Sequence, residues 1–379
     1  MTRNHALCRF SFAAAAIAEC ACLLLCLAPA PANAADKSAA AAGTWDRAAA
    51  ARYLDSREVW WQGWDRAQKD HGTLCVSCHT QATFALARPA LRAELAEKQP
   101  NAAEDAMLTS IEKRVRMWNE VLPFYSDALY GTGKEIESRN AESVLNAIIL
   151  ASYDARRGHL GETTRLAFDH AWALQSASGP DAGSWVWQNF DFAPWESKES
   201  QYYWAAQMAL TVASAPDRYR SDPTAAAHLA LLKAFLRGHY AAQPLINQVM
   251  AVRAASQLSG LLPRMQRIAL LAQIEALQHA DGGWSLSDLG TWHRRDKTPL
   301  VTDSDGFATG LVTLTLEENH LRNEHVARGL AWIETHQDKA TGAWPAWSVN
   351  KDRDPQSNIG RFMSDAATGY AVLALEARR

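Results

Sequence analysis

The sequence has no excess of basic residues, no long apolar run beyond residue 34 and almost no β-strand pattern. It contains 38 Lys and Arg against 41 Asp and Glu, so neither nucleic acid nor an anionic membrane surface is an expected partner. The missing apolar run excludes a membrane span after that point. A hydrophobic share of 48% with 21% charged residues excludes a disordered or fibrous chain. Tryptophan, in contrast, is abundant, with 15 residues.

The first 34 residues have the pattern of an export signal. Arg3 and Arg9 give a positive start, a mostly apolar stretch covers 10–30, and Ala32-Asn-Ala34 fits a signal-peptidase site. We expect cleavage after Ala34 and a periplasmic or secreted protein with no stable membrane span. Glu19 interrupts the apolar stretch, so retention as a membrane anchor stays an alternative.

Cysteine is sparse after this signal: the rest of the chain contains only Cys75 and Cys78. Residues 75–79 read Cys-Val-Ser-Cys-His, the attachment pattern of c-type haem. Thiols at this spacing can bond the two vinyl-derived carbons of one porphyrin, and the adjacent imidazole can ligate the iron. The sequence therefore predicts one covalent haem c, held by Cys75 and Cys78, with His79 as its proximal ligand.

Three other roles for the two cysteines stay open. A thioredoxin-like redox pair needs a strand and helix context that the sequence does not have. A zinc site needs further close ligands, and no second cysteine pair exists. A structural disulfide between Cys75 and Cys78 fits an oxidising compartment.

From Trp45 onward the chain repeats at intervals of about 55 to 60 residues. Residues 305–316 and 364–375 align without gaps, and each segment follows a Gln…Gly-x-Trp turn. One helix of a repeat has a single apolar stripe, as at 326–333, and the other is apolar nearly all round, as at 307–314. This pattern indicates an amphipathic outer helix followed by a buried inner helix.

We predict an all-α fold of six such hairpins in a single domain over residues 45–379. Closed on itself, this would be an α6/α6 toroid with the haem site in the first repeat; the alternative is an open solenoid with capping repeats. The predicted hairpins cover roughly 45–95, 105–156, 161–215, 225–262, 264–318 and 324–378.

The Gln…Gly-x-Trp turns resemble the QW repeats of squalene-hopene cyclases and of other terpenoid-cyclase and prenyltransferase toroids, over most of 161–378. The resemblance implies that each Gln and Trp ties outer helices together and has no catalytic part. The implied pairs are Gln175 with Trp185, Gln278 with Trp284 and Gln337 with Trp344.

The resemblance also marks Asp303 and Asp305, which fall where protonating cyclases of this family carry Asp-x-Asp-Asp. It implies Asp305 as a general acid for an alkene, although Gly306 replaces the last Asp of the motif. An Asp at this point is otherwise a helix N-cap. The zinc site of the protein prenyltransferases needs a Cys that no matching repeat provides.

Alignment of the repeats puts His79 at the start of an inner helix, at the mouth of the ring. Met363, in the adjacent last repeat, is then the first candidate for the distal iron ligand, and His293 and His71 are weaker ones. A core-filling Met and a five-coordinate iron are the alternatives. Pro89 predicts that the first inner helix ends early or kinks.

Further polar and aromatic residues are expected at this mouth. Paired carboxylates there could act on glycosides, or could be helix-start acids facing water. The carboxylates are Glu196, Glu199, Asp303, Asp305 and Asp365. A tryptophan group could line a cavity for a flat or apolar molecule, or fill the core. Its members are Trp187, Trp195, Trp204, Trp292 and Trp347.

Together these patterns favour an exported c-type haem protein that transfers electrons, or performs redox chemistry on a small, terpenoid-like molecule. Its expected partners are that small molecule and a redox protein. Two alternatives remain: a terpenoid cyclase or isomerase with Asp305 as general acid, and a non-enzymatic haem-based sensor of ligand or redox state.

Overall fold

The computed structural model describes residues 45–126 and 129–377, and the predicted signal, residues 1–34, lies outside them. This part of the chain is mostly helical, which confirms the all-α class. Its α-helices are α1 (Arg47–Gln62), α2 (Gln81–Glu94), α3 (Ala102–Arg116), α4 (Gly131–Arg157), α5 (Glu162–Leu174), α6 (Ser200–Ser214), α7 (Pro223–His239), α8 (Leu245–Gln257), α9 (Arg264–Ala276), α10 (Gly306–Glu318), α11 (Glu324–Thr335) and α12 (Phe362–Ala377). Two short strands, β1 (Gln68–Lys69) and β2 (Thr73–Leu74), pair antiparallel.

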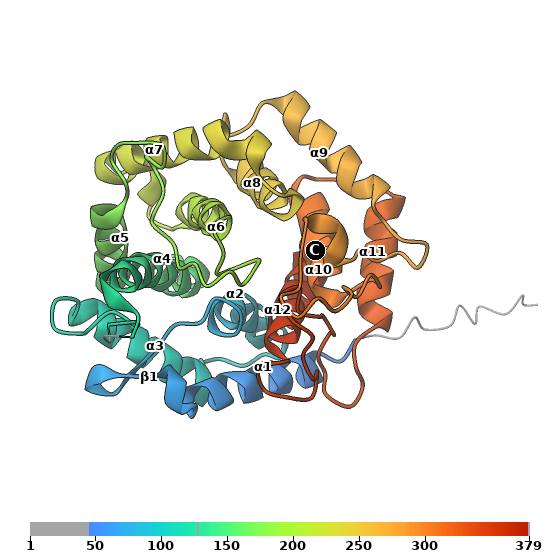
Figure 1. The fold of residues 1–379 in the computed structure, drawn as a ribbon, viewed down its shortest axis with the longest axis horizontal. Coiled ribbons are helices and arrows are strands. Elements are labelled where there is room, and N and C mark those ends of the chain that lie inside the picture. The colour runs from blue at the N-terminus through green and yellow to red at the C-terminus, as the bar shows by residue number, and fades with distance from the viewer. Residues whose placement is uncertain (1–44, 127–128, 378–379) are drawn as a thin grey trace, which may run out of the picture. The chain divides into compact units, whose positions relative to one another are not determined.

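The even-numbered helices contact one another in a cycle. Helix α2 packs on α4, α4 on α6, α6 on α8, α8 on α10, and α10 on α12, which packs back on α2. The odd-numbered helices lie outside this cycle, as Figure 1 shows. None of the helices in the described part of the chain is both long enough and apolar enough to cross a bilayer.

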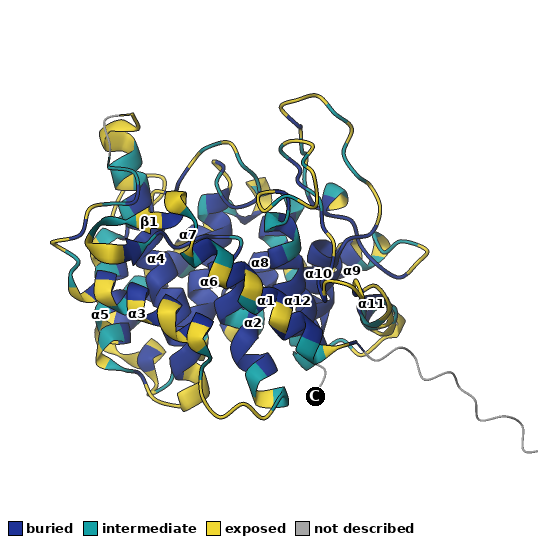
Figure 2. Ribbon diagram, turned by 90° about the horizontal axis from the view of Figure 1, so that it is seen from below, coloured by how far each residue is buried: buried dark blue, intermediate teal, exposed yellow. Residues whose placement is uncertain are grey.

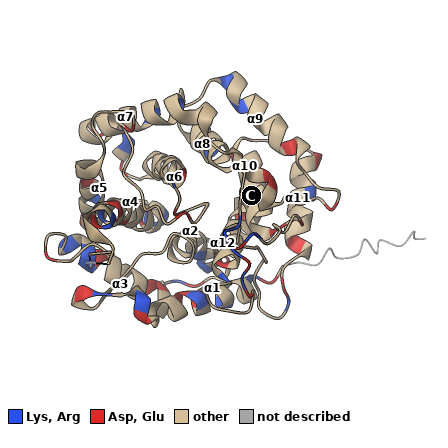
Figure 3. Ribbon diagram, viewed as in Figure 1, with Lys and Arg blue, Asp and Glu red and all other residues tan. Residues whose placement is uncertain are grey.

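The two kinds of helix differ in burial as their apolar patterns predict. Helix α10 is buried on every side, with Phe307 and Leu311 fully inaccessible, because neighbours cover it all round. Outer helix α11 buries Val326 and Ile333 but leaves its other face in water. Figure 2 shows the buried residues gathered on the inner helices, and Figure 3 shows the charged residues concentrated on outer helices such as α1, α3, α9 and α11.

Three Gln…Gly-x-Trp turns share the bonds donated by the Gln amide and by the Trp indole, but the Gln oxygen pairs with a backbone N–H in the last turn and with a histidine Nδ1 in the other two. In the last one, the Gln337 amide donates to the carbonyls of Gly342 and Asp46, both at 2.9 Å, and its oxygen accepts from Asp46 N at 2.7 Å. Trp344 Nε1 donates to Ile333 O at 2.7 Å. Each turn thus ties the end of one outer helix to the start of another. The corresponding residues are Gln175, Gly183 and Trp185 with His228, and Gln278, Gly282 and Trp284 with His325.

Pro89 was predicted to end or kink the first inner helix early. It does not end the helix, because α2 continues past Pro89 to Glu94. A proline has no N–H, so the carbonyl four residues before it, that of Ala85, loses its helical donor. The Ser152 hydroxyl of α4 lies 3.3 Å from this oxygen and is also 2.7 Å from Ile149 O. The Ser152 hydroxyl of the neighbouring inner helix therefore partly replaces the backbone N–H that Pro89 cannot donate to Ala85 O.

Helix α1 carries a buried acid, Glu58, that makes stability depend on pH. Its Oε1 accepts from the amides of Gln62 and Gln81, both at 2.8 Å, while Oε2 has no partner among the described residues. Burial raises the pKa of Glu58 from 4.5 to about 7. Between these values the folded chain binds more protons than the unfolded chain, so the free energy of unfolding falls as pH rises through this window.

We expect Glu58→Gln to remove this loss. An amide stays neutral, so at pH 8 the variant should be more stable than wild type by up to about 3 kcal/mol, while near pH 4 the two should be similar. Denaturant unfolding at both pH values measures the difference. A difference that is the same at pH 4 and pH 8 would contradict the assignment.

Candidate functional site

The Cys-x-x-Cys-His segment lies in the turn that leads into inner helix α2. The β1–β2 pair precedes it, and Cys75 N donates to Ala67 O at 2.7 Å, which fixes where the segment starts. At its other end the Ser77 hydroxyl accepts from Thr80 N at 3.2 Å and from Gln81 N at 2.9 Å. These two bonds satisfy N–H groups at the helix start, which have no partner within the helix.

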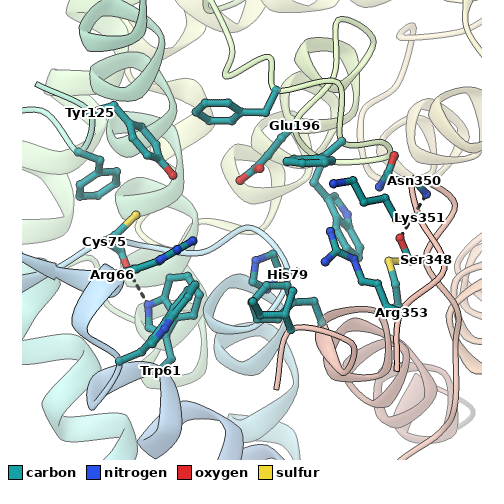
Figure 4. Close-up of a pocket in the computed structure, with 18 of the residues that line it drawn as sticks. Trp61, Arg66, Cys75, His79, Tyr125, Glu196, Ser348, Asn350, Lys351 and Arg353 are labelled. Carbon is teal, nitrogen blue, oxygen red and sulfur yellow. Dashed lines mark hydrogen bonds between the residues drawn. The ribbon is translucent and has the colours of Figure 1, made fainter. Parts of the chain in front are cut away.

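A cavity of about 760 Å³ opens beside this turn, within the roughly 300–1,000 Å³ range of small-molecule and cofactor sites. Its walls come from the end of α1, β1, three loops and the start of α12 (Figure 4). Aromatic rings line much of it: Trp61, Trp64, Phe124, Tyr125, Tyr130, Phe190, Phe192, Trp195 and Phe362.

Both cysteines are free thiols and both are buried. Cys75 lines the cavity, whereas Cys78 does not. Burial raises the pKa of Cys75 to about 12 and holds that of Cys78 well above its usual value, so neither is a reactive thiolate. Among the described residues no three His, Cys, Asp or Glu side chains gather as a metal site. The thioredoxin-like, zinc and disulfide alternatives therefore gain no support.

His79 lines the same cavity as Cys75. Its ring stacks on Phe362, with centroids 3.7 Å apart, and meets Trp61 edge-on at 5.5 Å. Nδ1 lies 2.9 Å from Thr80 Oγ1. Burial, together with the nearby charges of Arg57 and Arg353, lowers the pKa of His79 to about 3, so the imidazole is neutral and can act as a ligand.

Met363, the predicted distal ligand, is buried and lines this cavity as well, so the structure brings it together with Cys75 and His79. The two weaker candidates do not join them. His293 and His71 are exposed, neither lines the cavity, and His71 Nδ1 lies 3.1 Å from Asp70.

Of the predicted carboxylates, only Glu196 lines the cavity. Figure 4 shows its carboxyl pointing into the space bounded by Tyr125, Cys75 and His79. Burial raises the pKa of Glu196 to about 7, against the opposing charge of Lys134. Its carboxyl can therefore hold or release a proton near neutral pH.

The other carboxylates lie elsewhere. Asp305 is buried at the start of α10, where its Oδ1 accepts from the backbone of Phe307 and Ala308, both at 2.9 Å, and its Oδ2 from Leu286 N at 2.5 Å. Burial raises the pKa of Asp305 to about 6, but all its donors are backbone N–H groups, as at a helix N-cap. Asp303 is exposed. Glu199 is also exposed and accepts from Ser197 Oγ at 3.2 Å. Asp365 is buried outside the cavity lining and accepts from Thr80 Oγ1 at 2.6 Å.

Several cavity residues were not anticipated. Four basic side chains line it: Arg66, Lys69, Lys351 and Arg353. Lys351 and Arg353 belong to a loop with no periodic pattern, so only its position just before α12 could have indicated them. Of the predicted tryptophan group, Trp195 alone lines the cavity. Trp187 and Trp204 stack on each other in the core, Trp347 borders a second, far smaller pocket, and Trp292 is half-buried.

No model of a known protein family matches the sequence. No curated protein matches it either. Two solved structures, a wild-type glycosidase and a glycosidase variant, are similar at 14% and 13% identity. Each comparison covers 88% of this chain and 98% of the other, with a TM-score of 0.49, and at that level neither carries an argument about what this chain does.

Proposed function

We propose that this chain is an exported c-type haem protein built as an α6/α6 toroid, which transfers electrons or performs redox chemistry on a small molecule. One observation carries the proposal: Cys75, His79 and Met363 line a single cavity of about 760 Å³ with aromatic walls. The sequence motif supplies the attachment chemistry, and the cavity supplies a space with aromatic walls beside it.

The residues present suit a haem. Cys75 is a free thiol in the cavity wall and can form one thioether bond, and His79 offers a neutral imidazole. Cys78 is also a free thiol but does not line the cavity, so the second thioether requires its sulfur to turn toward the cavity. Nothing among the described residues hydrogen-bonds to His79 Nε2, and Met363 is the sulfur ligand available in the same cavity. Arg66, Lys351 and Arg353 supply cations for the two propionates. When bound, a haem would supply one-electron oxidation and reduction at this site.

Glu196 favours redox chemistry on a small molecule over electron transfer alone. A protein that only passes electrons needs no titratable group in its cavity, whereas coupled chemistry needs a proton donor or acceptor. Glu196 can hold or release a proton at its carboxyl oxygens near pH 7. The nearby Tyr125 hydroxyl, whose pKa is raised by burial, stays protonated and can orient a bound molecule by donating a hydrogen bond.

The two alternatives receive less support. A cyclase acid must present its carboxyl to a cavity, but the three backbone bonds of Asp305 occupy both of its oxygens, and it borders a pocket of only about 10 Å³. A haem-based sensor would use the same cavity, and its binding of a ligand without turnover would distinguish it from an enzyme.

The test is the haem content of the full chain made in a host with the cytochrome c maturation machinery. We expect a red product with one haem per chain that survives denaturation, and an absorption spectrum that sharpens on reduction with dithionite. The same chain made without the machinery should be colourless. A folded, exported but colourless product from the competent host would reject the proposal.

A further inference from the structure

A chain of short hydrogen bonds leads from His79 into the protein. Nδ1 of His79 lies 2.9 Å from Thr80 Oγ1, which donates to Asp365 Oδ2 at 2.6 Å. These residues are far apart in sequence, because His79 and Thr80 precede α2 whereas Asp365 is in the first turn of α12. The contact between α2 and α12 brings them together.

The Asp365 carboxyl accepts hydrogen bonds from three buried side chains, Tyr53, Arg57 and Thr80. Its Oδ1 accepts from Arg57 Nε at 2.7 Å and from the Tyr53 hydroxyl at 2.8 Å. Arg57 can only donate, and it is itself anchored on Asn358, whose side-chain and backbone oxygens lie 2.9 and 2.7 Å from its terminal nitrogens. Asp365 and Arg57 are both almost fully buried, so water does not screen this pair.

This arrangement determines where the Thr80 hydroxyl hydrogen points and which nitrogen of His79 carries the ring proton. A threonine hydroxyl has one hydrogen, and the carboxylate of Asp365 takes it. Thr80 Oγ1 can then only accept from His79, so the imidazole proton is on Nδ1 and Nε2 is left with a free lone pair.

We propose that Asp365, acting through Thr80, is a positioning residue that holds the His79 ring with Nε2 available to the iron and increases its electron donation. The inference rests on the proposed haem function. A hydrogen-bonded partner on the second nitrogen of a ligating histidine raises its basicity. A more basic ligand favours ferric over ferrous iron, so the intact chain lowers the reduction potential of the site.

The experiment measures the reduction potential of the holoprotein by optical redox titration. In Thr80→Val the shape is kept but the hydroxyl is lost, so the relay is broken. In Asp365→Asn the charge at its end is lost. Both variants should shift the ferric–ferrous equilibrium toward ferrous by about tenfold, which is 59 mV for a one-electron couple. Thr80→Ser keeps the hydroxyl and should restore the wild-type potential.

Asp55→Asn is the matched control. Asp55 of α1 pairs with the buried Arg88 of α2 at 2.8 Å, so this variant breaks an ion pair in the same hairpin without contacting His79. We expect it to lower stability and leave the potential unchanged. If Asp365→Asn does not fold, the Thr80→Val and Thr80→Ser pair still decides the question.

The outcomes separate the inference from the proposed function. A wild-type chain without covalent haem rejects the function. Covalent haem with equal potentials in wild type, Thr80→Val and Asp365→Asn rejects the positioning role and leaves the function standing. An equal shift in Asp55→Asn would also reject it, because the effect would then be a general loss of packing.

Discussion

A Cys75→Ala/Cys78→Ala variant is expected to carry no covalent haem, whereas the wild-type chain made in the same host carries one. The thioether bonds need both sulfurs, and beyond residue 34 the chain has no other cysteine to replace them. Haem staining of a denaturing gel and the visible spectrum measure the loss. Alanine is the suitable replacement, because both positions are buried and a serine would add an unpaired hydroxyl there.

The same variant should keep most of its helix. The hydrogen bonds that start α2 come from the Ser77 hydroxyl, and neither thiol takes part in them. Circular dichroism at low temperature provides this folding control, and the single variants Cys75→Ala and Cys78→Ala show whether one thioether suffices. Wild-type haem staining in the double variant would contradict the assignment of the motif.

The periodicity of apolar residues was enough to predict the all-α class. One segment of each repeat has a single apolar stripe at helical spacing, and the other is apolar nearly all round, so the two kinds of helix could also be told apart. The alignment of the repeats also brought His79 and Met363 to one end of neighbouring inner helices, and both line the cavity. The N-cap alternative for Asp305 rested on its place before an apolar run, and its side chain does cap α10.

Apart from Trp195 and Glu196, the loop residues that line the cavity were beyond such reasoning. Phe190, Lys351 and Arg353 come from loops, where no period relates one side chain to the next. The strands β1 and β2 have two residues each, too few to show alternation. The link between Thr80 and Asp365 depends on how α12 sits against α2, and the order of residues along the chain does not contain that register.

The junction between the last and first outer helices depends on one glycine. Gly342 has φ +82°, and a Cβ there would lie 2.3 Å from Ala49 O in α1. The same turn holds Gln337 against Asp46, so a displaced backbone would also strain those bonds. A Cβ added at Gly183 would likewise lie 2.2 Å from a backbone carbonyl of α7, and one added at Gly282 would lie 2.9 Å from a backbone carbonyl of α11.

We therefore expect Gly342→Ala to lower the free energy of unfolding by about 2–5 kcal/mol. About 1–2 kcal/mol of this comes from holding an alanine in the left-handed region, and about 1–3 from the clash with α1. The midpoint of denaturant unfolding, followed by circular dichroism, measures the change.

Gly179→Ala separates the two contributions, because Gly179 has the same φ of +82° but an added Cβ would have nothing within 4 Å. This control should lose only the conformational part, about 1–2 kcal/mol. The excess loss in Gly342→Ala then measures how tightly the last Gln…Trp turn packs on α1. Equal losses in the two variants would mean that the turn moves aside at little cost, and that the contact between the two ends of the helical array contributes little to stability.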